Sequence, residues 1–121
     1  MISIFLADGE NHVRAALKLL IEYQPEMVVA GEAENSESLL AQVCANPPDV
    51  ILLDWGLPGM RPQKLIQTLR SYCNNSLIIA LSVKPEDEQV VKEYDLDGFI
   101  SKQLSPEEFI LSLKLSACGK I

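Results

Sequence analysis

The feature that most constrains the fold of this chain is a regular alternation of short apolar runs with longer segments of helical period. The apolar runs are rich in β-branched and aliphatic residues and occupy residues 2–7, 27–33, 50–53, 77–81 and 98–101. Three of them are apolar nearly throughout, which is typical of strands that are covered on both faces. The pattern predicts five strands of a parallel sheet.

The segments between these runs place apolar residues on one side of a helix. The spacing of three and four residues predicts five helices, with apolar faces formed by Val13, Ala16, Leu17, Leu20 and Ile21; Leu39, Leu40 and Val43; Leu65, Ile66, Leu69 and Tyr72; Val90, Val91 and Tyr94; and Phe109, Ile110 and Leu113. The last helix has the clearest start, because Ser105 can cap it, Pro106 suits its first position and Glu108 completes a capping box.

A strict (βα)₅ alternation in 121 residues predicts one α/β domain over residues 1–121. Right-handed crossovers return the chain beside its previous strand, so helices cover both faces of the sheet. We expect the doubly wound strand order 2-1-3-4-5. The chain stops just past the last predicted helix, which favours a domain boundary there.

Composition excludes several classes of function. The formal charge is −7, from 17 acidic residues against 10 lysines and arginines, so direct binding to the phosphate backbone of nucleic acids is not expected. The cysteines are three, far apart and without C-x-x-C spacing, which favours free thiols in a reducing cytoplasm. No apolar run approaches the ~20 residues of a membrane span, and the N-terminus does not resemble a signal peptide. A cytoplasmic location without membrane contact is expected.

Polar residues stand where four of the predicted strands end. Asp8 follows the first strand, Asp54 the third, Ser82 the fourth and Lys102 the fifth. The functional crevice of an open parallel sheet lies outside the carboxyl ends of its strands, so these side chains are expected to converge. Two acids, a hydroxyl and an ammonium suit phosphoryl transfer onto a carboxylate. Asp54 would be the nucleophile, a divalent metal would screen the charges, and Lys102 and Ser82 would hold the phosphoryl group.

The segments "IFLADGE", "VILLDWGLPGM", "IIALSV" and "DGFISK" occur in the order and separation of a known family. Over essentially its full length the chain resembles the receiver domain of bacterial two-component response regulators. "FLADGENHVRAAL", "VVAGEAENSESLL" and "DGFISKQLSPEE" further resemble receivers of the LuxR/NarL type, which precede a helix-turn-helix DNA-binding domain. The resemblance implies a flavodoxin-like, or CheY-like, fold.

The resemblance also implies roles for individual residues. Asp54 would accept a phosphoryl group from a sensor histidine kinase, with Lys102 and Ser82 beside it. Mg²⁺ would be held by Asp8, Asp54 and the backbone carbonyl of Gly56, and Ser82 and Phe99 would form the switch pair. The domain would be a signalling module and not an enzyme, apart from self-phosphorylation by phosphodonors and autodephosphorylation.

The implied partners are the kinase and an output domain or partner protein, with a homodimer as a further expectation. The output would be one such as transcription. DNA would be contacted only through a C-terminal domain that is absent from this chain.

Three departures from the family pattern bear on function. Gly9 replaces an acid that is usually a direct metal ligand, so Mg²⁺ is expected to bind weakly, and the longer arm of Glu10 would have to reach the metal through water. After Pro58 the family often has an acid followed by glycine, where this chain has "GMRPQ". The segment "VVKEYDLDGFI" is about two residues shorter than in related receivers, which predicts a short or irregular fourth helix.

Other interpretations remain open from the sequence. A degenerate receiver would have the same fold and act by constitutive protein contact. An aspartate-nucleophile phosphatase would require D-x-D, but Gly56 stands where the second aspartate of that motif would be. An FMN-binding module would require a phosphate-binding loop after the first strand, where the segment "DGENH" is acidic. Single residues also have simpler interpretations. Asp54 could form a turn, Asp8 could be a loop acid and Ser82 could cap a helix. Lys102 could be a solvated surface lysine, Trp55 and Phe99 could simply pack, and His12 has no assigned function.

Overall fold

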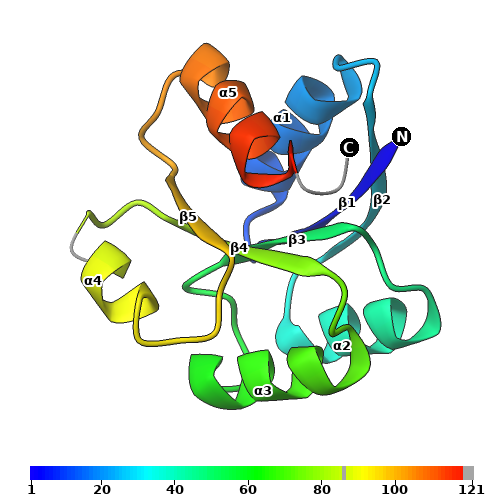
Figure 1. Cartoon of the computed structure of the whole chain (residues 1–121), viewed down its shortest axis with the longest axis vertical. Coiled ribbons are helices and arrows are strands. Elements are labelled where there is room, and N and C mark those ends of the chain that lie inside the picture. The colour runs from blue at the N-terminus through cyan, green and yellow to red at the C-terminus, as the bar shows by residue number, and fades with distance from the viewer. Residues whose placement is uncertain (86, 119–121) are drawn as a thin grey trace.

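The structure is a computed structural model that describes residues 1–85 and 87–118. Within this part of the chain, parallel strands form one sheet in the order β2-β1-β3-β4-β5 (Figure 1). The strands are β1 (Ile2–Ala7), β2 (Met27–Ala33), β3 (Val50–Asp54), β4 (Leu77–Ser82) and β5 (Gly98–Ser101). The predicted (βα)₅ doubly wound α/β fold is confirmed.

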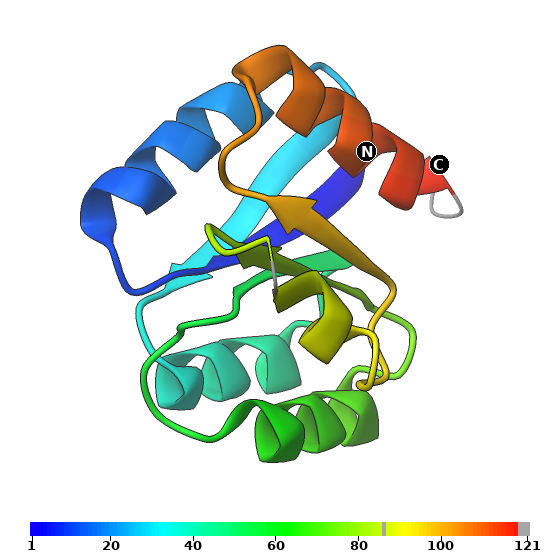
Figure 2. The same ribbon diagram turned by 90° about the vertical axis from the view of Figure 1, so that its left-hand side faces the viewer.

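The helices cover both faces of this sheet. They are α1 (Asn11–Glu22), α2 (Ser36–Ala45), α3 (Pro62–Tyr72), α4 (Asp87–Val91) and α5 (Pro106–Ser116). Figures 1 and 2 show α1 and α5 on one face and α2 and α3 on the other, with α4 beside the β5 edge. This division follows from right-handed crossovers on either side of the first strand.

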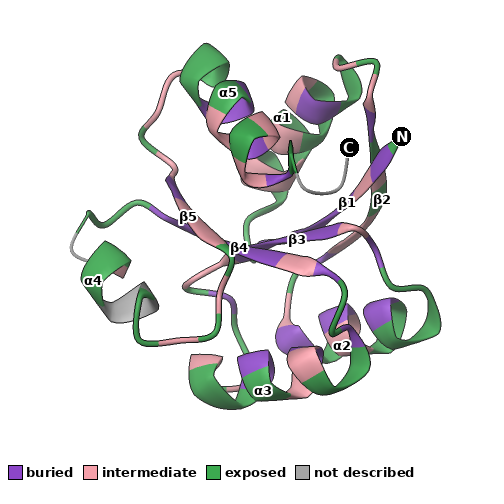
Figure 3. Cartoon of the chain, in the orientation of Figure 1, coloured by how far each residue is buried: buried purple, intermediate pink, exposed green. Residues whose placement is uncertain are grey.

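The central strands β1, β3 and β4 send alternate side chains into two separate cores. Ile4, Leu6, Leu52, Ile79 and Leu81 pack with residues of α1 and α5, whereas Phe5, Ala7, Ile51, Leu53 and Ile78 pack with residues of α2 and α3. Figure 3 shows this burial concentrated along the central strands. Both faces are covered, which explains why the strands read as continuous apolar runs. The strands are therefore held firmly, and the residues that follow them at the carboxyl edge of the sheet have well-defined positions.

The capping box predicted for the last helix is confirmed. The Ser105 side chain accepts a hydrogen bond from the Glu108 backbone N–H, and the Glu108 side chain accepts one from the Ser105 N–H, which completes the capping box. Pro62 stands at the start of α3, so the unusual "GMRPQ" sequence does not disturb that helix. None of the helices in the described ranges is both long and apolar enough to cross a membrane.

Some local predictions differ from the structure. β3 and β4 each extend one residue further than predicted, so Asp54 and Ser82 belong to the strands. The spacing predicts Tyr72 on the apolar face of α3, but this last residue of the helix is largely exposed. The fourth helix is short as expected, at five residues, and Tyr94 lies beyond it. The side chains of Val90 and Val91 lie outside the described part.

Candidate functional site

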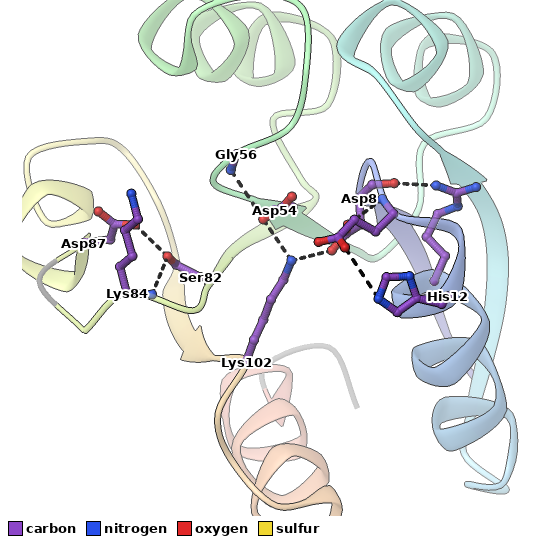
Figure 4. Close-up of polar contacts among 10 residues, drawn as sticks. Asp8, His12, Asp54, Gly56, Ser82, Lys84, Asp87 and Lys102 are labelled. Carbon is purple, nitrogen blue, oxygen red and sulfur yellow. Dashed lines mark hydrogen bonds and ion pairs between the residues drawn. The ribbon is translucent and has the colours of Figure 1, made fainter.

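The sheet register brings three charged residues to one point. Ala7 of β1 pairs with Leu53 of β3, so Asp8 and Asp54 stand side by side at the next position. Ser82 of β4 pairs with Ser101 of β5, and Lys102 follows directly. The three predicted site residues Asp8, Asp54 and Lys102 therefore meet at the carboxyl edge (Figure 4).

The Lys102 ammonium bridges the two carboxylates. Its Nζ lies 2.6 Å from Oδ2 of Asp8 and 3.0 Å from Oδ1 of Asp54. The side chain of Lys102 is 13% exposed, that of Asp54 16% and that of Asp8 only 1%. Lys102 is therefore not the solvated surface lysine of the alternative interpretation. Three charges share a largely dehydrated site, where their interaction is stronger than in water.

The pKa of Lys102 reflects two opposing effects. Burial lowers this pKa, but the hydrogen bonds to Asp8 and Asp54 and the negative charge of both carboxylates raise it by more. The net pKa lies above the ordinary lysine value, so the side chain is a permanent cation at neutral pH. It neutralises part of the charge of the acidic pair.

Asp54 is the acid best placed to react. Its Oδ1 accepts hydrogen bonds from Lys102 and, at 3.3 Å, from the backbone N–H of Gly56. The hydrogen bonds described for this carboxylate both go to Oδ1, which leaves Oδ2 as the oxygen available for bond formation. Gly56 lies in a tight turn in which the N–H of Leu57 donates to the carbonyl of Asp54.

Asp8 is held in place by backbone and side-chain contacts. Its Oδ1 accepts from the N–H of Glu10 at 3.0 Å, and its carbonyl oxygen accepts from Nη1 of Arg14 at 2.6 Å. Arg14 also pairs through Nε with Glu32 of β2 at 3.1 Å and donates to Asn11. Asp8 is thus held by Glu10, Arg14 and Lys102, so it is more than a simple loop acid.

Arg14 was missed in the sequence. The signal that could have revealed it is its helical position, three and seven residues before the apolar Leu17 and Ile21. An arginine that is largely buried beside the apolar stripe of a helix requires polar partners, and here they are the carbonyl oxygen of Asp8 and the partly buried carboxylate of Glu32.

Asp8 and Asp54 form a minimal donor set for a divalent metal. Carboxylate oxygens from both residues lie within 3.0 Å of one nitrogen, so the pair can share a single cation. Mg²⁺ commonly binds through one or two carboxylates and keeps several waters, which fits this arrangement. Within the described ranges, no group of three or more histidine, cysteine, aspartate or glutamate residues is arranged to hold a metal. The Asp8, Asp54 and Gly56 ligand set remains a prediction.

The contacts described for the Glu10 carboxylate and for the space beside Gly9 are with groups other than the acidic pair. The Glu10 carboxylate lies 3.5 Å from Nε2 of His12, and both side chains are exposed. A Cβ on Gly9 would lie 3.1 Å from Cδ of Pro58, in the loop that follows β3. Figure 4 shows His12 beside the site without contact to Asp54. The participation of Glu10 through water stays untested.

Ser82 is at the same edge but is engaged elsewhere. Its buried Oγ donates to Oδ2 of Asp87 at 2.6 Å and accepts from the backbone N–H of Lys84 at 3.1 Å. Asp87 is the first residue of α4 and was not singled out in the sequence. The described contacts of this hydroxyl therefore lead to α4 and not to Asp54.

Two aromatic residues, Trp55 and Phe99, lie near the site. Trp55 follows Asp54, and its ring meets the ring of Tyr94 edge to face, with centroids 5.1 Å apart. Phe99 of β5 is half-buried and pairs in the ladder with Ala80. Together with Tyr94 it lines a cavity of about 290 Å³ beneath α4. The switch role of Phe99 remains a prediction.

The structure thus combines a doubly wound parallel sheet with two acids and a lysine that meet at its carboxyl edge. The profile of the response regulator receiver domain family matches residues 4–114. The chain therefore belongs to the response regulator receiver domain family, as the sequence motifs predicted.

Relatives and solved structures agree with this assignment. The chain is 32% identical to nitrate/nitrite response regulator protein NarL of Escherichia coli, over 98% of this chain and 56% of that protein. It is 31% identical to phosphate regulon transcriptional regulatory protein PhoB of Pseudomonas aeruginosa, over 93% of this chain and 50% of that protein. The chain thus spans about half the length of these relatives. The predicted likeness to receivers of the LuxR/NarL type is confirmed.

The solved structures share the fold. A LuxR-family two-component response regulator from Aurantimonas superposes with a TM-score of 0.88 at 21% identity, covering 98% of this chain and 86% of that one. The isolated receiver domain of RcsB from Salmonella enterica, solved with the phosphomimetic BeF₃⁻, has a TM-score of 0.82 at 23% identity, covering 93% and 85%.

Proposed function

We propose that this domain is a phosphoacceptor of a bacterial two-component system and is phosphorylated on Asp54 with the help of Mg²⁺. The observation that carries the proposal is the Lys102 ammonium, 3.0 Å from Oδ1 of Asp54 and 2.6 Å from Asp8 at the carboxyl edge of the sheet. A fixed cation beside a carboxylate is what a developing phosphoryl charge requires.

The residues divide the chemistry between them. Oδ2 of Asp54 forms the new bond to phosphorus, while the bond from phosphorus to the donor atom breaks and its electron pair leaves with the donor. Lys102 then holds a phosphoryl oxygen, and Ser82 donates its hydroxyl hydrogen to another. When bound between Asp8 and Asp54, Mg²⁺ would supply a second positive charge for the transferring group. The product carries about −1.5 to −2 charges where one stood before.

The proposed partners follow from the family. A sensor histidine kinase is the donor, and the receiver reads the modification out through an output domain or partner protein, with transcription as the output class. Receivers of the LuxR/NarL type precede a DNA-binding domain, so contact with DNA would be made through a C-terminal domain that lies outside these residues. A cytoplasmic location, a homodimer and the absence of enzymatic turnover beyond self-phosphorylation and autodephosphorylation complete the proposal.

A degenerate receiver is the second candidate, because two observations favour it. Gly9 leaves the site with two acids in place of three, and Lys102 already forms an ion pair with each of them. Such a domain would have the same fold and signal by constitutive protein contact, without metal or phosphate.

Mass spectrometry separates the two candidates. We expect the intact chain to gain one phosphoryl group when a small phosphodonor such as acetyl phosphate is added with Mg²⁺. The Asp54→Asn variant should gain none, and Asp95→Asn, at an exposed acid away from the site, should gain as much as the unmodified chain. No gain at saturating Mg²⁺, or an undiminished gain in Asp54→Asn, would transfer the assignment to the degenerate receiver.

A further inference from the structure

The hydroxyl of Ser82 is already committed in this structure. It is 5% exposed, donates to Oδ2 of Asp87 at 2.6 Å and accepts from the Lys84 N–H at 3.1 Å. Figure 4 shows Ser82, Lys84 and Asp87 as one group, separate from the Asp54, Lys102 and Asp8 group. A hydroxyl-to-carboxylate bond of this length belongs to the strong, charge-assisted class.

The stoichiometry of this hydroxyl creates a competition. A serine side chain has one hydrogen to donate, and both a carboxylate and a phosphoryl group are acceptors only. The N–H of Lys84 donates to a lone pair of the Ser82 oxygen, so this bond does not decide which acceptor receives the hydroxyl hydrogen. The Ser82 hydrogen can therefore serve Asp87 or a group on Asp54, but not both.

We propose that Asp87 is a positioning residue that withholds the Ser82 hydroxyl in the unphosphorylated chain. The phosphoryl group on Asp54 gains this hydroxyl only by displacing Asp87. The inference rests on the proposed function. It deepens that function by naming the residue whose hydrogen bond to Ser82 must break before Ser82 can bind the phosphoryl group.

The position of Asp87 gives the exchange a mechanical consequence. Asp87 is the first of only five residues in α4, and its carboxylate ties the start of this short helix to the end of β4. Loss of the bond to Ser82 frees the beginning of α4 from the sheet. By linkage, a partner that favours the released α4 favours the phosphoryl-bound state by the same factor.

A plain effect of charge must be distinguished from this competition. Asp87 carries a negative charge near the site, so its removal favours any anion there, whatever Ser82 does. The competition predicts in addition that the effect of Asp87 depends on the Ser82 hydroxyl. A double-mutant cycle measures this dependence.

The experiment is a titration of the full chain with beryllofluoride in saturating Mg²⁺, followed by the fluorescence of Trp55. The fluorines stand in for phosphoryl oxygens as hydrogen-bond acceptors. The variants are Asp87→Ala, Ser82→Ala and the double variant, with Asp87→Asn as the conservative change. Glu88→Ala is the matched control, because it removes the same charge from the neighbouring residue of α4 without touching the Ser82 bond. Thermal melting verifies that each variant is folded.

We expect Asp87→Ala to tighten beryllofluoride binding about tenfold, the worth of one charge-assisted hydrogen bond. In the Ser82→Ala background the same change should have little effect, and Glu88→Ala should have little effect in either background. Asp87→Asn should fall between, because a neutral amide oxygen is a weaker acceptor.

The outcomes separate this inference from the proposed function. If the unmodified chain binds beryllofluoride but Asp87→Ala leaves the affinity unchanged, lowers it, or raises it equally without Ser82, the competition is refuted and the phosphoacceptor function stands. If the unmodified chain does not bind beryllofluoride at all, the phosphoacceptor function fails and the inference falls with it.

Discussion

Removal of the Lys102 ammonium should destabilise the fold, and a divalent cation should repair much of the damage. Lys102→Met keeps most of the aliphatic stem but leaves Asp8, 1% exposed, and Asp54 without their shared cation. Removing one partner of a buried ion pair costs about 3–5 kcal/mol, because the remaining charge is left buried and unpaired. Lys102 is partly open to solvent, so we expect about 3 kcal/mol in chelator.

Urea unfolding in chelator and in millimolar Mg²⁺ measures this effect. The midpoint should fall in Lys102→Met with an unchanged slope, and Mg²⁺ should stabilise the variant more than the unmodified chain, because the cation enters the place of the ammonium. Lys114→Met is the matched control. Its ammonium lies 2.9 Å from Glu26, but both side chains are more than a third exposed, so the loss should stay below about 1 kcal/mol.

The same ion pair has a signature in alkaline solution. The pKa of Lys102 is raised in the folded chain. Its stabilising contribution is therefore complete below the unfolded lysine pKa of about 10.4 and is lost as the pH rises through the higher folded value. Stability above pH 10 should decline more in the unmodified chain than in Lys102→Met. A loss in Lys102→Met no larger than in Lys114→Met, with equal Mg²⁺ responses, would refute the view that this ammonium balances the acidic pair.

Two further substitutions test the loop that follows β1. Gly9→Asp should lower the Mg²⁺ midpoint in a Trp55 fluorescence titration and lower the melting temperature in chelator, since a third carboxylate attracts the metal and repels its neighbours. Gly9→Ala is the control, because its Cβ makes the same 3.1 Å contact with Pro58 and so separates the effect of the carboxylate from that of the added carbon. Equal Mg²⁺ midpoints in both variants would mean that position 9 does not face the metal. Arg14→Met should cost about 2 kcal/mol in urea and slow phosphorylation of Asp54, because the carbonyl of Asp8 loses its charged donor. The control is Lys18→Met, because Lys18 lies 3.7 Å from the same Glu32 at the surface. This substitution should neither destabilise the fold nor slow phosphorylation, and equal effects of the two substitutions would contradict a positioning role for Arg14.

The fold could be predicted because its signals are local and repeated. The alternation of apolar runs with helical periods fixes which segments are strands, and the chirality of crossovers leaves few ways to arrange them. Once the strands are parallel, residues that follow them must gather at one edge. Asp8, Asp54 and Lys102 were therefore found without knowledge of any contact between them.

The fourth helix was predicted less fully. The short segment before β5 indicated a short fourth helix, but it did not indicate which contacts hold the chain between this helix and β5. In the structure Arg70 of α3 binds the carbonyl oxygens of Ser76 and Asp95 and the carboxylate of Asp97, which fixes the segment leading into β5. These partners lie up to 27 residues from Arg70, and no local pattern joins them.

The sequence by itself determined the sheet order and the set of charged residues at its edge, because periodicity and strand direction act over a few residues at a time. Only the tertiary structure decided which partner each polar group takes. Lys102 bridges residues 48 and 94 positions away, and Ser82 donates to Asp87 where a site beside Asp54 was expected. Such choices depend on small differences in position, because hydrogen bonds form only within a narrow range of distance and angle. Those positions are set by the packing of α1, α4 and β5 around the site and not by any one segment of the chain.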